Sequence, residues 1–213
     1  MIIFDFFSGT GSSTQAFKDA GHTVYSFELD GNFVATEHVN IATLTAEYLL
    51  EKYGRPDFIW ASPPCTTFSV ASVGTHWIMG GKNPVPKSDE AKESIELVEH
   101  TLKLIKDLNP KLGWLMENPR GMLRKLKIVA ALPRRSVTYC QYGEKYMKPT
   151  DLWGQVNGWT PLEPCKNGMD CHQSSPRGSH NKGVQGLVNA KERAHVPYAL
   201  GKEILLVLES RNE

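Results

Sequence analysis

The chain has 213 residues, enough for one α/β domain with a sizeable hydrophobic core. Its 24 basic and 23 acidic residues give a formal net charge of +1, which gives no general signal for a nucleic-acid or membrane surface but leaves a local basic face open. No run approaches the roughly 20 apolar residues of a membrane span, and the apolar start meets Asp5 without a basic region before it. We therefore expect a cytoplasmic protein whose four cysteines are free thiols or metal ligands.

The first predicted unit is a buried parallel strand over 2–7, a glycine loop over 8–13 and a helix over 14–20. Glycines in such a loop let the backbone approach a ligand closely, and the exposed amides of the next helix suit a polar or anionic group. The third glycine of the dinucleotide-binding pattern is missing, so a plain tight turn explains the loop about as well. Asp5 either contacts a ligand or is a structural carboxylate that orders the loop.

A second strand over 23–27 ends in Glu28, Leu29 and Asp30. An acid 17 residues beyond Gly11 can accept hydrogen bonds from both hydroxyls of a ribose. Loop, strand and acid together favour a cofactor that carries a nucleoside.

A third unit, with a helix over 42–52 and a strand over 58–61, leads into Ser62, Pro63, Pro64 and Cys65. Two prolines prevent the strand from continuing and prevent a helix from starting at once. Cys65 is therefore expected on a stiff loop at the carboxyl end of a strand, where α/β proteins bind ligands and where a thiol can act as a nucleophile. The competing interpretation is that Cys65 is a small core residue.

Glycines and prolines then interrupt residues 70–87, which form either a loop that closes over a substrate or a plain surface loop. His76 within it is a surface or packed histidine by default, with a ligand or base as the lesser option. A helix follows over 88–108, with an apolar stripe that we assign to the core. The next strand, 112–116, ends in Glu117, Asn118 and Pro119, so Glu117 is expected on the same sheet edge as Cys65.

Taken in order, four motifs resemble those of the cytosine-5 DNA methyltransferases, in particular the small forms that phages and prophages carry. They are Phe7 to Gly11, Glu28, Ser62 to Cys65 and Glu117 to Pro119. The likeness runs from Ile2 to about Val207. It implies a doubly wound, mostly parallel sheet of the Rossmann-like S-adenosylmethionine-dependent methyltransferase type, with residues 1–213 as a single domain.

The resemblance also implies a pocket for S-adenosylmethionine. Phe7, Gly9 and Gly11 would lie against the cofactor, Glu28 would hold its ribose, and Asn40 or Ile41 would lie near its adenine. The full set of candidate cofactor contacts is Asp5, Phe7, Ser8, Gly9, Gly11, Glu28, Leu29, Asn40, Ile41, Ser62 and Pro63.

For the chemistry, the resemblance makes Cys65 the nucleophile that adds to C6 of cytosine and Glu117 the acid that hydrogen-bonds N3 and the exocyclic amine. Lys148 and Thr150 occupy places where the family puts a basic pair near the target base and the backbone. In the family, the segment matching Arg193 to Pro197 packs beside the first glycine loop and closes the cofactor pocket. Here it leads into a helix predicted over 198–209, which we otherwise assign to the core.

Residues 154–188 form a short irregular insert where larger enzymes carry a target-recognition domain. Sequence reading would then fall on loops, on Arg124, Lys125 and Lys127, or on a partner chain or dimer. Arg177, His180 and Lys182 make the insert a candidate phosphate contact. Cysteine and histidine side chains in and near it admit either a structural zinc or unpaired thiols; the zinc candidates are Cys140, Cys165, Cys171 and His172.

The sequence thus predicts an S-adenosylmethionine-dependent enzyme that methylates C5 of cytosine in DNA. One alternative keeps the chemistry but changes the substrate to a nucleotide, single-stranded DNA or RNA. Another is a non-catalytic nucleic-acid-binding or cofactor-binding module, which would have no need for both Cys65 and Glu117.

Overall fold

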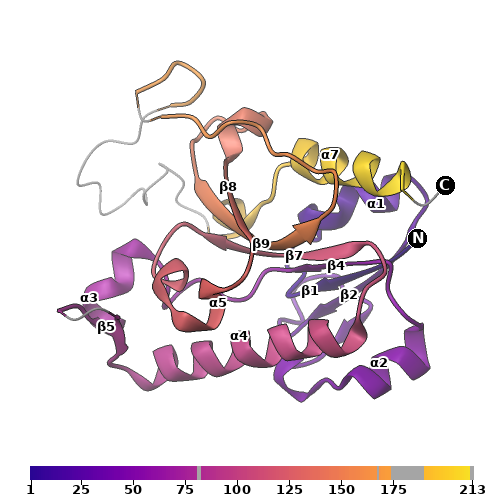
Figure 1. The fold of residues 1–213 in the computed structure, drawn as a ribbon, viewed down its shortest axis with the longest axis horizontal. Coiled ribbons are helices and arrows are strands. Elements are labelled where there is room, and N and C mark those ends of the chain that lie inside the picture. The colour runs from indigo at the N-terminus through magenta and orange to yellow at the C-terminus, as the bar shows by residue number, and fades with distance from the viewer. Residues whose placement is uncertain (81–82, 167, 174–189, 212–213) are drawn as a thin grey trace.

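The computed structural model of the protein describes residues 1–80, 83–166, 168–173 and 190–211. In that part of the chain, one seven-stranded sheet has the order β3-β2-β1-β4-β7-β9-β8 (Figure 1). Its strands are β1 Ile2–Phe6, β2 Thr23–Glu28, β3 Glu37–His38, β4 Phe58–Ala61, β7 Gly113–Pro119, β8 Arg134–Thr138 and β9 Pro149–Val156. The helices are α1 Gln15–Asp19, α2 Ala46–Tyr53, α3 Val73–His76, α4 Asp89–Leu108, α5 Lys127–Ala130, α6 Ala190–Ala194 and α7 Tyr198–Glu209.

The first five strands of this order, β3 to β7, run parallel to one another. The last two are antiparallel additions, because β9 runs against β7 and β8 runs against β9. The prediction of a doubly wound, mostly parallel sheet is confirmed. The antiparallel β8 and β9 were not predicted.

Helices cover both faces of the sheet: α1 and α7 lie on one side, and α2, α4 and α5 on the other (Figure 1). Alternate residues of β1 point to opposite faces, as a strand requires. Phe4 and Phe6 belong to the core cluster that packs under α2 and α4, while Ile3 belongs to the cluster under α1 and α7.

Local signals explain where the long helices begin and end. The hydroxyl of Ser88 accepts a hydrogen bond from the Ala91 amide at the start of α4, and Asn109 ends that helix in the left-handed region with φ 47°. The helix predicted from residue 42 starts later, at Ala46, because residues 41–43 form a separate 3-10 turn and Thr45 provides the helix cap.

Where the structure describes them, residues 70–87 contain regular secondary structure instead of the expected loop. They contain a 3-10 turn, α3 and the small hairpin of β5 Trp77–Ile78 with β6 Val85–Pro86. His76 Nδ1 lies 2.7 Å from the Ser88 hydroxyl, so this histidine contacts the capping residue of α4. Among the described helices, none is long and apolar enough to cross a membrane.

Candidate active site

The glycine loop after β1 turns through unusual backbone conformations. Gly9 and Gly11 have φ of 48° and 72°, and Phe7, which is not a glycine, has φ 59°. Positive φ is costly for a side chain with a Cβ, and such residues cluster where a site requires a particular backbone path. A Cβ at Gly9 would meet no atom within 4 Å, so the loop leaves open space at its tip.

The acid at the end of β2 lies against this loop. Glu28 Oε2 accepts a hydrogen bond from the Gly9 amide at 2.8 Å, and Oε1 accepts from the amides of Leu29 and Asp30 at 2.9 and 3.0 Å. Three backbone amides therefore fix the direction of the carboxylate. Leu29, beside it, is 68% exposed, which leaves a large apolar surface next to the acid.

Asp5 lies beneath the loop and is fully buried. Its carboxylate accepts hydrogen bonds from the hydroxyls of Ser13, at 3.1 Å, and Thr14, at 2.7 Å. Burial raises the pKa of Asp5 to about 6, although both hydrogen bonds work in the opposite direction. This geometry favours the structural interpretation of Asp5, while the buried Ser8 hydroxyl close by has no hydrogen-bond partner.

The segment after β3 lies alongside Glu28, because the Val39 amide donates to the Glu28 carbonyl at 2.8 Å. The Asn40 side chain accepts from the Ala42 amide and caps the following turn. The Ile41 side chain is buried in the core. Both candidate adenine contacts therefore come shortly after the residue that pairs with Glu28, with Asn40 exposed and Ile41 buried.

The loop that follows β4 holds Cys65 in a tight turn. The Cys65 carbonyl accepts hydrogen bonds from the amides of Phe68 and Ser69 at 3.0 and 2.9 Å. A Cβ at Gly121 would stand 2.3 Å from the Phe68 carbonyl oxygen, so only glycine allows the 121 segment to approach this loop. Cys65 itself is half-buried, not packed in the core.

The Cys65 loop is tied to the strand that carries the acid. β4 and β7 are parallel neighbours, so Glu117 and Cys65 follow the same edge of the sheet, as predicted. The Asn118 side chain donates a 2.9 Å hydrogen bond to the carbonyl of Pro63, on the Cys65 loop. Asn118 was part of the sequence motif, but its bridging role was not anticipated.

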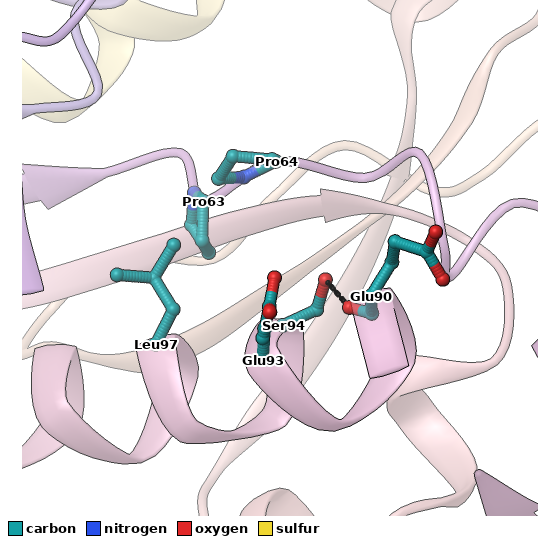
Figure 2. Close-up of a pocket in the computed structure, with 6 residues that line it drawn as sticks. All are labelled: Pro63, Pro64, Glu90, Glu93, Ser94 and Leu97. Carbon is teal, nitrogen blue, oxygen red and sulfur yellow. Dashed lines mark hydrogen bonds between the residues drawn. The ribbon is translucent and has the colours of Figure 1, made fainter. Parts of the chain in front are cut away.

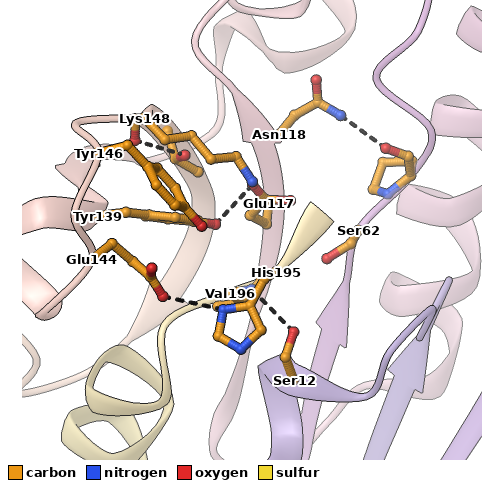
Figure 3. A network of polar contacts seen from close by, with 12 residues as sticks. Ser12, Ser62, Glu117, Asn118, Tyr139, Glu144, Tyr146, Lys148, His195 and Val196 are labelled. Atoms are coloured by element: carbon orange, nitrogen blue, oxygen red, sulfur yellow. Dashed lines mark hydrogen bonds and ion pairs between the residues drawn. The ribbon is translucent and has the colours of Figure 1, made fainter. Parts of the chain in front are cut away.

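Lys148 and Tyr139 reach Glu117 from the connection between the antiparallel strands β8 and β9 (Figure 3). The Tyr139 hydroxyl donates to Glu117 Oε1 at 3.1 Å, and Lys148 Nζ lies 4.0 Å from the same oxygen and 4.5 Å from the centre of the Tyr139 ring. All three side chains are buried. Nothing in the sequence pattern had singled out Tyr139.

These charges act on one another because the site is shielded from solvent. Burial raises the pKa of Glu117, while the Lys148 ammonium and then hydrogen bonds from Tyr139 and Ser62 lower it. Burial and then the Glu117 carboxylate raise the pKa of the Cys65 thiol, which Lys148 lowers. Cys65, Glu117 and Lys148 are thus electrostatically coupled.

Thr150 contacts the backbone of Lys148. Its hydroxyl donates to the Lys148 carbonyl at 3.3 Å, and Thr150 is fully buried. Lys148 has φ 23°, a conformation that L residues rarely adopt. The contact fits a positioning role for Thr150.

A cavity of about 200 Å³ adjoins the Cys65 loop (Figure 2). It lies between the two prolines of that loop and the first turns of α4, and its lining residues are Pro63, Pro64, Glu90, Glu93, Ser94 and Leu97. Apolar walls with two carboxylates suit a ligand that has both carbon surface and positive charge.

The C-terminal segment packs beside the glycine loop, as the resemblance implied. The Val196 amide donates to the Ser12 hydroxyl at 3.0 Å (Figure 3). A Cβ at Gly201 in α7 would stand 3.0 Å from the Ser13 carbonyl oxygen, so the helix lies close against the loop.

The zinc candidates Cys140, Cys165, Cys171 and His172 come together, with all their ligand atoms within 4.8 Å of one another.

β9 extends through Val156, so the first three residues of the expected insert belong to the sheet. Of the expected DNA contacts, Arg124 forms an ion pair with the buried Asp151 at 2.8 Å. Arg177, His180 and Lys182 lie outside the described residues.

The pattern of strands, loops and acids matches a known family. Residues 1–131 match the family model for C-5 cytosine-specific DNA methylases. The chain belongs to this family. Over 220 residues it is 30% identical to the "Probable DNA (cytosine-5)-methyltransferase" of Frog virus 3, an alignment that covers 96% of this chain and 99% of the viral one.

Solved structures support the family fold. A protein encoded within an E. coli prophage aligns with a TM-score of 0.52 at 20% identity, over 73% of this chain and 46% of that one. The Entamoeba histolytica methyltransferase EhMeth aligns with a TM-score of 0.55 at 13% identity, over 78% of this chain and 57% of that one. The chain thus spans about half the length of these two structures, although it spans nearly all of the frog virus relative.

Proposed function

We propose that this member of the C-5 cytosine methylase family transfers a methyl group from S-adenosylmethionine to C5 of cytosine in DNA, with Cys65 as the nucleophile and Glu117 as the acid. The observation that carries the proposal is the coupling of these two groups. Cys65 follows β4 and Glu117 lies in β7, the parallel neighbour of β4. The hydrogen bond from Asn118 in β7 to Pro63 ties that strand to the Cys65 loop, and a buried lysine acts on both groups.

The residues of the glycine loop and of β2 fit the cofactor. Glu28 is oriented by backbone amides to accept ribose hydroxyls, Leu29 offers an exposed apolar surface to the adenine, and the unpartnered Ser8 hydroxyl is available for a hydrogen bond. S-adenosylmethionine supplies an electrophilic methyl group on a positively charged sulfur.

In the proposed reaction, the Cys65 sulfur adds as a thiolate to C6 of the base, which makes C5 nucleophilic enough to take the methyl group. Burial raises the pKa of Glu117, which favours its taking up a proton when the base binds and donating that proton to N3 as the sulfur adds. Water then takes the C5 proton, the electron pair of that bond re-forms the C5–C6 double bond and expels the Cys65 thiolate, and N3 returns its proton to Glu117. Lys148 stabilises negative charge at Cys65 and Glu117.

The cytosine must leave the duplex to reach a half-buried thiol, at a cost of roughly a few kcal/mol. No separate recognition domain is present in the described residues. We therefore assign the reading of the sequence around the base to loops of this chain or to a partner chain.

Trapping on duplex DNA that contains 5-fluorocytosine tests the mechanism. Because fluorine cannot leave as a cation, the native chain should remain covalently attached to the DNA when cofactor is present. Cys65→Ser should form no adduct. An adduct that survives in Cys65→Ser would refute the assignment.

Labelled methyl transfer to different acceptors tests the substrate. Duplex DNA, single-stranded DNA, RNA and deoxycytidine monophosphate are compared, and duplex DNA is expected to be methylated fastest. Faster transfer to another acceptor would move the same chemistry to that substrate. Binding of cofactor without transfer to any of them would favour a binding module.

Calorimetric titration with S-adenosylmethionine tests the cofactor site. Glu28→Gln should weaken binding about 10-fold or more, since it loses a charged acceptor for the ribose, a difference of about 1.4 kcal/mol per factor of ten. Asp30→Asn, an exposed residue in the same turn, is the matched control and should bind as the native chain does. Equal affinities for Glu28→Gln and the native chain would contradict the site.

A further inference from the structure

Three of the four cysteines of the chain gather at one place that the proposed methyl transfer does not use. Cys140 comes from the turn Tyr139–Tyr142 after β8, while Cys165, Cys171 and His172 come from the segment after β9. The fourth cysteine is the proposed nucleophile, Cys65. The gathering joins parts of the chain about 25 to 32 positions apart, so sequence proximity alone does not explain it.

The distances within the cluster fit a tetrahedral zinc ion. With Zn–S near 2.3 Å and Zn–N near 2.1 Å, the edges of a tetrahedron measure about 3.8 Å between two sulfurs and about 3.6 Å between sulfur and nitrogen. Cys171 Sγ lies 3.8 Å from Cys140 Sγ and 3.5 Å from His172 Nδ1, and Cys165 Sγ lies 3.7 Å from that nitrogen. The sulfurs of Cys140 and Cys165 lie closer, at 3.1 Å, and would separate on binding.

The segment that carries three of the ligands buries little apolar surface. Its described residues, 157–166 and 168–173, contain no helix or strand, and Trp159 is their one buried side chain. Leu162 and Met169 are about half exposed. Because burial of apolar surface is scarce here, a metal cross-link is the kind of contact that stabilises such a segment.

We propose that Cys140, Cys165, Cys171 and His172 bind one structural zinc ion. Binding releases the thiol protons and involves no change of oxidation state. The Gln141 side-chain amide, 3.5 Å from Cys171 Sγ, donates to a ligand sulfur, as groups around metal sites commonly do. With all four positions taken by protein, the site is of the closed, structural type.

The metal would also steady the base-binding side of the sheet. Cys140 directly follows Tyr139, whose hydroxyl donates to Glu117, and the Cys165 amide donates to the Thr138 hydroxyl at 2.8 Å. Removing zinc should therefore increase amide hydrogen exchange in residues 138–148 as well as in 157–173, while the strands β1 and β2 stay protected.

Metal analysis of the untagged, dialysed protein tests the proposal. Mass spectrometry of the metal content should find one zinc per chain, and replacement by cobalt should give the sulfur charge-transfer band and the intense visible bands of tetrahedral coordination. Cys171→Ser should lose most of the zinc. Cys65→Ser, the matched thiol control, should retain one equivalent.

Two measurements keep the test decisive if a serine variant does not fold. His172→Cys preserves a four-ligand set and should retain zinc, and the three cluster thiols of the folded native chain should react with a thiol reagent only after the metal is removed. A native chain without zinc, a full equivalent in folded Cys171→Ser, or a disulfide between Cys140 and Cys165 in a reducing buffer would overturn the proposal.

Discussion

At the proposed cofactor edge of the sheet, around β1 and β2, the candidate functional groups are held mainly by the backbone of nearby residues. Glu28 accepts hydrogen bonds from the amides of Gly9, Leu29 and Asp30. At the proposed base edge, around β7 and β9, they are held by side chains from distant segments. Glu117 is held by Tyr139 and Lys148, which lie 22 and 31 positions further along the chain.

This difference predicts which side-chain substitutions the two edges tolerate. Backbone amides remain when a side chain is replaced, so the cofactor edge depends on loop conformation. Buried charges at the base edge depend on each other, and the loss of one leaves its partner without compensation. Substitutions at the two edges should therefore differ in size and in kind.

The largest effect is expected from Arg124→Met. Asp151 in β9 is fully buried and accepts from Arg124 at 2.8 Å and from the Ser136 hydroxyl at 2.6 Å. Removing the guanidinium leaves a buried carboxylate without its charge partner, which should lower the free energy of unfolding by about 3–5 kcal/mol in urea denaturation. Lys103→Met, which breaks an exposed pair with Asp107, is the control and should unfold as the native chain does. A small loss for Arg124→Met would show that the ion pair with Asp151 contributes little to stability.

The next effect concerns Asp5 beneath the cofactor loop. Because its pKa is raised to about 6 in the folded state, from 3.8, folding favours the protonated form. The stabilisation is present below the unfolded pKa and is lost as pH rises through 6, a change of about 3 kcal/mol. Relative to Asp5→Asn, which does not titrate, the native chain should therefore lose about 2–3 kcal/mol of unfolding free energy between pH 4 and pH 7.5.

Asp57 provides the contrast in sign. Burial works to raise its pKa, but the Lys111 ammonium at 2.8 Å and the Ile2 amide at 2.6 Å lower it overall. Its stabilisation is present above the unfolded pKa and is lost as pH falls. The unfolding free energy of the native chain, relative to that of Asp57→Asn, should thus increase as pH rises. If the corresponding difference for Asp5→Asn changed with pH in the same direction, the two assignments could not both hold.

A smaller effect is expected from Gly121→Ala. The new Cβ would stand 2.3 Å from the Phe68 carbonyl oxygen, so the Cys65 loop must shift. We expect a loss of about 1–3 kcal/mol of unfolding free energy, together with slower trapping on 5-fluorocytosine DNA. Gly74→Ala, where a Cβ meets no atom within 4 Å, is the control and should leave both unchanged.

The contrast between the edges also explains what the sequence could predict. Strand β4 and helix α7 were predicted to the residue, and Cys65 and Glu117 were placed on one edge, because these features follow from apolar runs, caps and prolines. The match of residues 1–131 to the family model covers the same parallel units.

The antiparallel strands β8 and β9 were missed because their sequences do not alternate between polar and apolar residues. β9 buries both of its faces from Thr150 to Gly154, including the charged Asp151. A charged residue in such a run is predicted to be exposed unless its partner is known. The partner of Asp151, Arg124, lies 27 positions earlier in the chain, so the sequence pattern did not reveal it. For the same reason, Tyr139 carried no signal, since its role depends on where Glu117 ends up.

The smallest and most diagnostic effect is a pair of opposite shifts in the pKa of the Cys65 thiol. Glu117→Gln removes a negative charge that raises this pKa, so the thiol should ionise at lower pH than in the native chain. Lys148→Met removes the positive charge that lowers it, so the thiol should ionise at higher pH. The pH dependence of Cys65 alkylation, followed by mass spectrometry of its peptide, measures both. Since a general loosening of the site would expose the thiol and move both variants in the same direction, shifts of equal sign would show that the three groups do not act on one another as charges.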